Sequence, residues 1–109
     1  MTSKKTTKSK RAQPPREFTR AKEFKKDWQR LTHSGRYDMN GLKEVMLLLI
    51  DNAAPLSKEW RDHALTGDWS GYRECHIGGD FLLIYKLESH SGDERVVFVR
   101  AGTHAELFE

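Results

Sequence analysis

Residues 72–87 read Tyr-Arg-Glu-Cys-His-Ile-Gly-Gly-Asp-Phe-Leu-Leu-Ile-Tyr-Lys-Leu, and this stretch decides the fold. Two runs rich in aromatic and β-branched residues flank a Gly-Gly pair, which is the strongest hairpin signal in the chain. If Gly78-Gly79 is the two-residue turn, His76 faces Phe81 and Glu74 faces Leu83 across the ladder. Alternation puts Glu74 and His76 on one face of the first strand and Cys75 on the other. We therefore expect a hairpin whose turn brings together a histidine, an aromatic ring and the carboxylate of Asp80.

Further strands are expected on both sides of this hairpin. Residues 88–94 read as a polar turn, and Arg95–Arg100 then forms a third strand, which completes an antiparallel meander. A short strand centred on Phe18 is expected to lie beside it. The chain closes with residues 101–109, which contain at most a short helical turn.

Two amphipathic helices are predicted between the Phe18 strand and the hairpin. Apolar residues recur at helical spacing from Lys22, and the first helix is expected to end near Gly35. Asp38 suits the cap of a second helix that runs from Met39 to about Asn52. We expect this second helix to be the most buried. Its apolar stripe contains Leu42, Val45, Met46, Leu49 and Ile50, broadened by Leu47 and Leu48.

The element order β-α-α-β-β-β predicts an α+β domain. Its small antiparallel sheet is expected to have the two N-terminal helices packed on one face, with a short C-terminal segment after the last strand. Residues 53–71 show little periodicity and read as a long connection, and such a loop in a compact domain is usually functional or misread.

A chain of 109 residues supports a single domain with one modest core. We place this domain at residues 16–109 and interpret residues 1–15 as a basic, disordered tail. The tail holds five of the 19 Lys and Arg and none of the 16 Asp and Glu, which leaves the domain formally at −2. The tail is either simply solvated or an arm that binds phosphates, and its composition leaves both interpretations open.

The sequence predicts a soluble, cytoplasmic protein with no membrane association. The single cysteine, Cys75, excludes an internal disulfide and fits a reducing compartment. No apolar signal-peptide core opens the chain, and the longest apolar run, Val45–Ile50, is far short of the ~20 residues that a membrane helix needs.

Five histidines invite a metal hypothesis, which the spacing does not favour. Zinc sites commonly pair their ligands at close spacings, and the chain has neither Cys-x-x-Cys nor His-x-x-x-His. Cys75 and His76 are neighbours on a strand, so their side chains point to opposite faces. We therefore expect no metal and no cofactor.

Acid–base chemistry fits the polar residues better. Cleavage of RNA by its own 2′-hydroxyl needs a proton acceptor, a proton donor and a cation beside the phosphate. The proton transfers could be shared among His63, His76, Asp80 and His104. Phosphate could be held by Arg73 or Arg100, and Phe81 and Phe108 offer flat faces to bases. Taken singly, each histidine is more often a surface or hydrogen-bonded residue, each phenylalanine a core residue and Asp80 a turn residue. His33 and His90 lie in predicted turns and are expected to face solvent.

Several sequence blocks, taken in order, resemble the YafQ family of toxins, within the RelE superfamily of bacterial type II toxin–antitoxin modules. The resemblance runs from about residue 16 to residue 109. It rests on the blocks Arg61-Asp62-His63, Gly71-Tyr72-Arg73-Glu74-Cys75-His76-Ile77, Asp80-Phe81-Leu82-Leu83-Ile84-Tyr85-Lys86 and Gly102-Thr103-His104-Ala105-Glu106-Leu107-Phe108.

The resemblance implies a ribosome-dependent mRNA endonuclease that acts in the decoding A site without a metal. Its partners would be mRNA on the ribosome, ribosomal RNA and a small antitoxin whose complex with the toxin commonly represses their operon. The family's catalytic histidines correspond to His63, His76 and His104, and its acidic residue corresponds to Asp80. Its terminal aromatic residue is Phe108. Phe81 departs from the pattern, because tryptophan is more usual there, so stacking would involve less area and the codon preference stays open.

Two other functions compete with the nuclease. One is a module of the same fold that occupies the ribosome or the antitoxin without cutting; growth arrest without cleaved message would favour it. The other is a DNA-binding or structural protein that uses the basic arm, and deletion of residues 2–15 would then remove most of its affinity and salt dependence.

Overall fold

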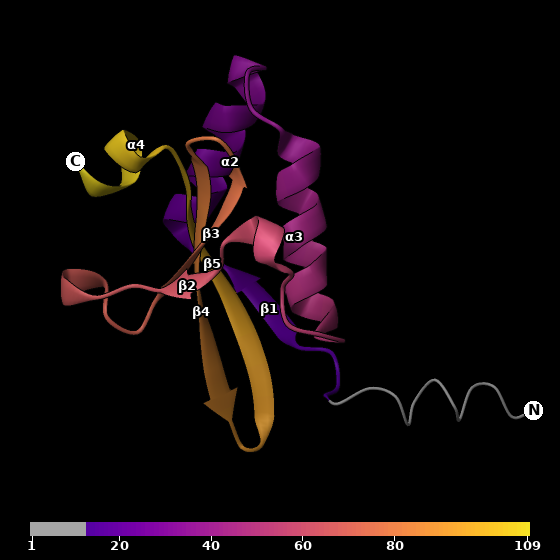
Figure 1. The fold of residues 1–109 in the computed structure, drawn as a ribbon. Helices are drawn as coiled ribbons and strands as arrows, with labels where there is room; N and C mark the ends of the chain where they lie inside the picture. The colour runs from indigo at the N-terminus through magenta and orange to yellow at the C-terminus, as the bar shows by residue number, and fades with distance from the viewer. Residues whose placement is uncertain (1–12) are drawn as a thin grey trace, which may run out of the picture.

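The computed structural model describes residues 13–109, which form a five-stranded sheet with helices on both sides (Figure 1). The strands lie in the order β1-β5-β4-β3-β2. The elements in chain order are β1 (Glu17–Arg20), α2 (Lys22–Ser34), α3 (Met39–Asp51), the 3-10 turn η1 (Lys58–Trp60), β2 (His63–Ala64), the 3-10 turn η2 (Gly67–Trp69), β3 (Arg73–Gly78), β4 (Phe81–His90), β5 (Asp93–Gly102) and α4 (His104–Phe108). The expected α+β class is confirmed. Residues 1–12, most of the predicted tail, lie outside the described residues.

The sheet is mixed, and the prediction of a wholly antiparallel sheet is wrong. The β3–β4–β5 meander is antiparallel as expected, but β1 pairs with β5 in parallel, with Glu17 opposite Arg95. After β1 the chain passes through α2 and α3 to β2 at the opposite edge of the sheet, and only β5, the last strand, returns to pair with β1. The alternation of residues within a strand does not show whether its partner runs parallel or antiparallel, so the sequence pattern could not reveal this pairing. A second difference is β2, a two-residue strand inside the predicted loop 53–71 that pairs with β3.

The hairpin forms where it was predicted, but its register differs by one residue. His76 lies opposite Leu82 rather than Phe81, and Glu74 lies opposite Ile84 rather than Leu83. The two-residue turn is Gly79-Asp80 rather than the predicted Gly78-Gly79, so Gly78 lies opposite Phe81, and an irregularity between Gly78 and His76 then shifts the register back by one residue. The alternation along β3 is unaffected, because Glu74 and His76 still share one face.

The main core lies between the sheet and the two long helices. Helix α2 ends at Gly35, which takes the left-handed conformation at φ 69°, as the sequence predicted. Helix α3 packs on the sheet with a stripe that contains Gly41, Leu42, Val45 and Leu49. The prediction that Leu47 and Leu48 widen this stripe is wrong, since they are 65% and 41% exposed. A helix that meets only one layer buries a single stripe, and these two residues lie outside it.

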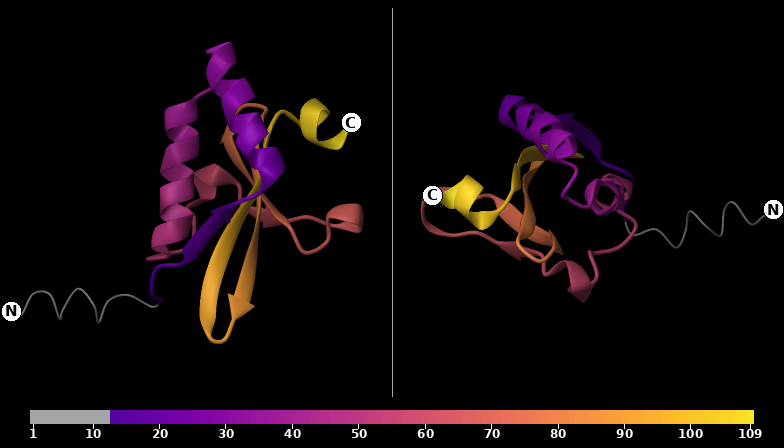
Figure 2. Two further views of the ribbon diagram at one scale, coloured as in Figure 1. Left: turned by 180° about the vertical axis from the view of Figure 1, so that it is seen from behind. Right: turned by 90° about the horizontal axis from the view of Figure 1, so that it is seen from above.

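The C-terminal helix α4 lies on the opposite face of the sheet (Figure 2), where a smaller apolar cluster forms. Leu82 and Ile84 of β4 pack there against Leu107 of α4. Helices α3 and α4 therefore lie on opposite sides of the strands. Within residues 13–109, the helices are all too short or too polar to cross a bilayer.

Gly41 has a specific packing role in the first turn of α3. Asp38 caps this helix by accepting a hydrogen bond from the Gly41 backbone nitrogen at 2.9 Å. A Cβ atom at position 41 would lie 2.6 Å from Asp38 Oδ2 and 3.1 Å from Ile77 Cγ2. Although alanine favours a helix interior by roughly 1 kcal/mol over glycine, this contact would displace the cap.

We expect Gly41→Ala to lower the free energy of unfolding by about 1 kcal/mol, the usual cost of a lost N-cap, despite the gain in helix propensity. Urea unfolding measures the change. Asn40→Ala, at the exposed neighbouring position, is the matched control and should stay within about 0.5 kcal/mol of the parent. A Gly41→Ala variant as stable as the parent would contradict the packing argument.

Candidate active site

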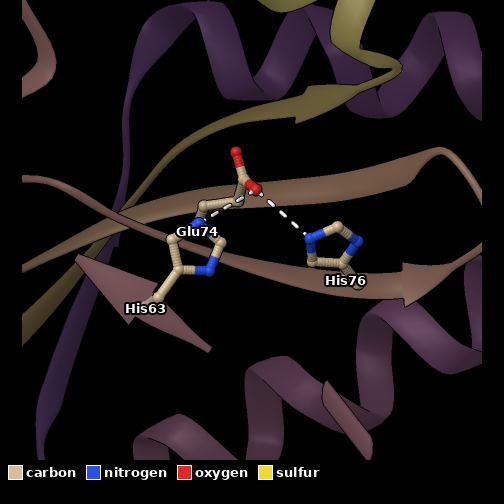
Figure 3. A group of neighbouring side chains, drawn as sticks. All are labelled: His63, Glu74 and His76. Carbon is tan, nitrogen blue, oxygen red and sulfur yellow. Dashed lines mark ion pairs between the residues drawn. The ribbon is translucent and has the colours of Figure 1, made fainter. Parts of the chain in front are cut away.

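Two histidines share one buried carboxylate on the face of the sheet that α2 and α3 leave open. The pairing of β2 with β3 sets His63 opposite Glu74, and His76 follows two residues later on the same face. Glu74 Oε2 lies 3.4 Å from His63 Nε2 and 3.2 Å from His76 Nε2, so the carboxylate stands between the two rings (Figure 3). Glu74 is only 4% exposed, whereas the His63 side chain is half exposed.

The second nitrogen of His63 is also engaged. Its Nδ1 lies 2.9 Å from the carbonyl oxygen of Arg61, a residue held in the left-handed conformation at φ 50°. A carbonyl only accepts hydrogen bonds, and so does an ionised carboxylate. His63 therefore lies between a backbone carbonyl and a carboxylate, and its ring is held in place from both sides.

A second histidine–carboxylate pair adjoins the first. His104 Nδ1 lies 2.7 Å from Asp80 Oδ1, and the His104 backbone nitrogen donates to the same oxygen at 3.2 Å. The hydrogen bond from the His104 side chain, helped by the backbone one, lowers the pKa of Asp80. An ionised Asp80 selects the tautomer that carries the proton on Nδ1, which leaves Nε2 of His104 free to accept a proton. The His104 and His76 rings lie 6.2 Å apart.

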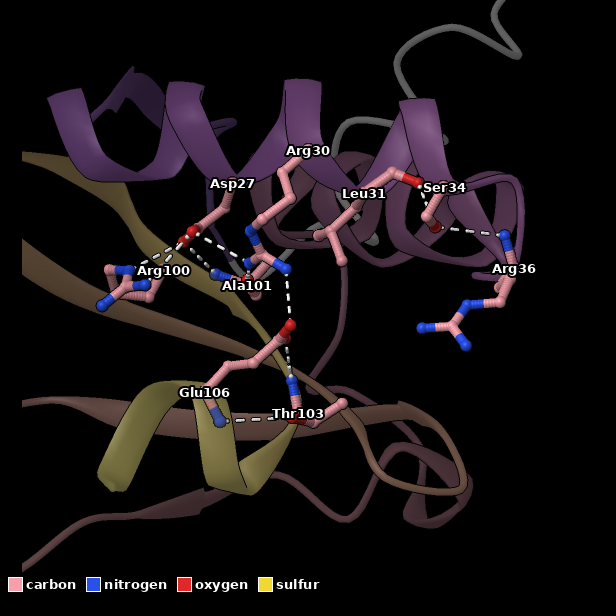
Figure 4. Close-up of polar contacts among 9 residues, drawn as sticks. All are labelled: Asp27, Arg30, Leu31, Ser34, Arg36, Arg100, Ala101, Thr103 and Glu106. Atoms are coloured by element: carbon pink, nitrogen blue, oxygen red, sulfur yellow. Dashed lines mark hydrogen bonds and ion pairs between the residues drawn. The ribbon is translucent and has the colours of Figure 1, made fainter.

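Helix α4, which begins at His104, is tied to α2 by a polar network (Figure 4). Thr103 and Glu106 form a capping box at its start. Arg30 of α2 donates to Glu106 at 2.6 Å and to Asp27 at 3.1 Å. Burial alone would raise the pKa of Asp27, but hydrogen bonds from Arg100, the Ala101 backbone and Arg30 together lower it. His104 is thus positioned by a network that reaches across to the other face of the sheet.

The predicted aromatic residues separate into one exposed and one buried ring. Phe108 is 36% exposed and packs against His104 at 5.8 Å and edge-on against Trp69 of η2 at 5.6 Å. Phe81 is 5% exposed, belongs to the main core and packs against Tyr37. Phe108 therefore keeps a face for a base, whereas Phe81 does not, because the strand register turns it toward the helices.

Neither arginine that the sequence nominated for phosphate lies among the histidines. Arg73 donates to Asp62 at 2.8 Å and to the Tyr85 hydroxyl, which itself donates to Asp62. These groups border a pocket of ≈670 Å³ beside the end of α3, and no histidine lines it. Arg100 donates to both carboxylate oxygens of Asp27 at 2.7 and 3.1 Å. Each guanidinium group is therefore already paired with a carboxylate of the protein and is not free to bind phosphate.

Three of these side chains form a group that could hold a metal ion. The ligand atoms of His63, Glu74 and His76 lie within 4.8 Å of one another, and two imidazoles with one carboxylate suit a divalent transition metal. The three residues are not paired at close spacing in the sequence, since His63 lies eleven positions before Glu74, so the sequence motifs of zinc sites do not reveal them. Strand pairing, rather than proximity in the sequence, brings His63 to Glu74.

Sequence reasoning missed two residues of this site, Glu74 and Trp69. Glu74 could have been found, since strand alternation already placed it on the face of His76. Trp69 lay in the patternless connection, where only the three-dimensional structure brings its ring to Phe108.

The arrangement as a whole is suited to moving protons around a phosphate diester. It places three imidazoles and two carboxylates side by side on one face, with an exposed aromatic ring at its end. Nε2 of His104 is available to accept a proton, and two further imidazoles lie beside the buried Glu74 carboxylate, so the site holds the paired groups that general acid–base catalysis requires.

Comparison with known proteins bears on this interpretation. The profile of a family described as "Bacterial toxin of type II toxin-antitoxin system, YafQ" matches residues 16–109. The mRNA interferase toxin YafQ of Escherichia coli is 47% identical over 79 residues, which are 72% of this chain and 82% of that protein. A crystal structure of YafQ from Escherichia coli matches at a TM-score of 0.76 and 40% identity, covering 86% of this chain and 99% of that one. The Escherichia coli DinJ–YafQ complex matches at a TM-score of 0.74 and 41% identity, with the same coverage.

Proposed function

Because this chain belongs to the YafQ family of toxins from bacterial type II toxin–antitoxin systems, we propose that it is an mRNA interferase that cuts message in the ribosomal A site. The observation that carries the proposal is the row of three histidines, with Glu74 between two of them and Asp80 beside the third. The relative at 47% identity is itself an mRNA interferase toxin.

The proposed reaction is attack of a ribose 2′-oxygen on the adjacent phosphorus, without a metal. His104 Nε2 takes the 2′-hydroxyl proton, while Asp80 holds Nδ1 and stabilises the imidazolium that forms. The bond to the 5′-oxygen breaks, and that oxygen takes a proton from His76 or His63 beside Glu74. The products are a 2′,3′-cyclic phosphate and a 5′-hydroxyl. Phe108 stacks on a neighbouring base.

The ribosome would supply the alignment that the isolated protein lacks. The described domain is not strongly basic, and the two arginines that the sequence nominated for phosphate are paired with carboxylates. Holding reactants in near-attack geometry contributes several kcal/mol in favourable cases. A ribosome that presents mRNA in the A site removes the need for tight binding to free RNA.

A cognate antitoxin is the proposed protein partner. The Escherichia coli relative is seen in complex with DinJ, and a small antitoxin is expected to neutralise this toxin in the same way. The toxin–antitoxin complex is proposed to bind the operator DNA of its own genes.

The test is to map mRNA cleavage by primer extension, with and without translating ribosomes, beside a His76→Ala/His104→Ala double variant. We expect in-frame cuts that require ribosomes and disappear in the double variant. Equal cutting of naked RNA would replace the proposal with a free ribonuclease. Growth arrest without any cut would favour the non-cleaving binding module.

A further inference from the structure

The proposed reaction lacks a cation for the phosphate among the arginines that the sequence nominated. Arg73 is paired with Asp62 and Arg100 with Asp27. Releasing either guanidinium would leave a partly or wholly buried carboxylate without its partner, which is costly. Another positive group close to Asp80 and His104 would fill this role at no such cost.

Arg36 has the required freedom. It lies in the loop between α2 and α3, where its backbone nitrogen donates to the Ser34 hydroxyl at 3.2 Å (Figure 4). Its side chain is exposed, and no carboxylate within residues 13–109 forms an ion pair with its guanidinium group. The guanidinium carbon of Arg36 lies 5.9 Å from the centre of the Tyr37 ring, so a ligand could contact the arginine and the aromatic ring at the same time.

A pocket connects this pair to the active site. It has a volume of ≈320 Å³ and takes its walls from three segments that are distant in sequence: the α2–α3 loop, the β3–β4 turn and the start of α4. The lining residues are Arg36, Tyr37, Asp38, Gly78, Asp80, Phe81 and Thr103. Asp80 is hydrogen-bonded to His104, and Thr103 is the residue immediately before His104 in the chain. The pocket therefore opens beside the groups proposed to act on the scissile bond.

The surroundings of the pocket suit a nucleotide. Tyr37 is half-buried and packs against Phe81, with ring centres 5.1 Å apart, so its ring is held in place. The two acidic side chains are already engaged, Asp38 by the Gly41 amide and Asp80 by His104. Apart from Gly78 and its two chain neighbours, no described residue has a heavy atom within 4 Å of where a Cβ at Gly78 would stand, which leaves room at the end of β3.

We propose that this pocket binds the nucleotide adjoining the cleaved bond, with Arg36 holding its phosphate and Tyr37 stacking on its base or ribose. The guanidinium supplies a charge-assisted, forked contact to phosphate oxygens, and an aromatic face is the usual platform for an unpaired base. This inference rests on the proposed function, because the same RNA strand must pass His104. It gives the strand two contacts near His104, one from Phe108 and one from the Arg36–Tyr37 pocket.

Direct binding tests the pocket without any need for cleavage. The isotope-labelled protein is titrated with a single-stranded tetranucleotide RNA whose 2′-hydroxyls are methylated, and amide and arginine side-chain signals are followed by NMR. We expect shifts at Arg36, Tyr37, Gly78 and Thr103. Arg36→Gln should weaken binding about tenfold or more and lower the salt slope by about 0.7. Tyr37→Leu should weaken it by about five- to a hundredfold, whereas Tyr37→Phe should not.

Arg20→Gln is the matched control, because it removes the same charge from an exposed position on β1 that lies outside the pocket. Equal weakening by Arg20→Gln and Arg36→Gln would mean a general charge effect and would overturn the proposal. Wild-type shifts confined to Trp69 and Phe108, or no shifts at all, would overturn it as well. Shifts in the pocket from a protein that cuts no mRNA on ribosomes would contradict the proposed function and leave the nucleotide site standing.

Discussion

Replacing His76 with alanine is expected to lower the single-turnover rate of mRNA cleavage on ribosomes by about 10²–10⁴-fold. His76 is central in the row of histidines, since its ring lies 6.1 Å from His63 and 6.2 Å from His104. Its loss removes a proton-transfer group and also leaves the buried carboxylate of Glu74 with a single partner. Quench-flow cleavage at saturating toxin measures the chemical step without the contribution of product release.

The matched control is His90→Ala, because His90 is exposed and lies at the opposite end of β4 from Leu82, the residue that pairs with His76. It should cleave at the parent rate. The thermal unfolding midpoint of both variants separates loss of chemistry from loss of folding. A folded His76→Ala variant that cuts within about threefold of the parent rate would remove His76 from the catalytic groups.

The largest expected effect on stability comes from Asp27. Its side chain is 5% exposed and receives hydrogen bonds from the Arg100 and Arg30 side chains and from the Ala101 backbone. Asp27→Ala should lower the free energy of unfolding by about 1–3 kcal/mol, the usual cost of leaving donors, here including the buried Ala101 backbone nitrogen, without their acceptor. Equilibrium urea unfolding at neutral pH measures the change. Glu44→Ala, which removes an exposed carboxylate from α3, should stay within about 0.5 kcal/mol of the parent.

The effect of Asp27 should also depend on pH in a defined direction. The folded-state pKa of Asp27 is lowered, so the stability that it contributes is fully present above the unfolded-state pKa of about 3.9. That contribution is lost as the pH falls through the folded-state pKa. The difference in stability between the parent and Asp27→Asn should therefore shrink on going from neutral to strongly acidic pH. A difference that stays constant over this range would contradict the assigned role of the charge.

Much of the fold could be predicted from local patterns. Periodicity and caps located α2 and α3 nearly to the residue, because Asp38 and Gly35 terminate the helices through contacts with their own neighbours. The β3–β4 hairpin was recognisable from its glycines. Its register was not, because the irregularity after His76 depends on packing across the sheet. The parallel pairing of β1 and the two-residue strand β2 are likewise set by distant partners, which no local pattern encodes.

The residues of the site also divide into those that the sequence could identify and those whose contacts depend on distant parts of the chain. Strand alternation put His76 on the same face as Glu74, and acid–base reasoning nominated His63, His76, Asp80 and His104, the same four residues that the family resemblance implies. The sequence could not show that Arg73 and Arg100 are unavailable for phosphate, because each pairs with a carboxylate from a distant part of the chain. Arg73 pairs with Asp62 before β2, and Arg100 pairs with Asp27 on α2. The candidate replacement, Arg36, stands in a loop where the sequence offers no signal beyond its charge.

The chemistry of the cut ends tests the central claim most directly. The parent toxin is added to ribosomes that carry a defined A-site codon, with a chelator chosen to leave the ribosomal magnesium in place while removing transition metals. The upstream fragment is then analysed for its 3′ end by mass spectrometry. Acid–base catalysis of 2′-hydroxyl attack predicts a 2′,3′-cyclic phosphate, or its 3′-phosphate hydrolysis product, at an unchanged rate. A free 3′-hydroxyl, together with activity that the chelator abolishes and added zinc restores, would contradict it and assign a metal to His63, Glu74 and His76.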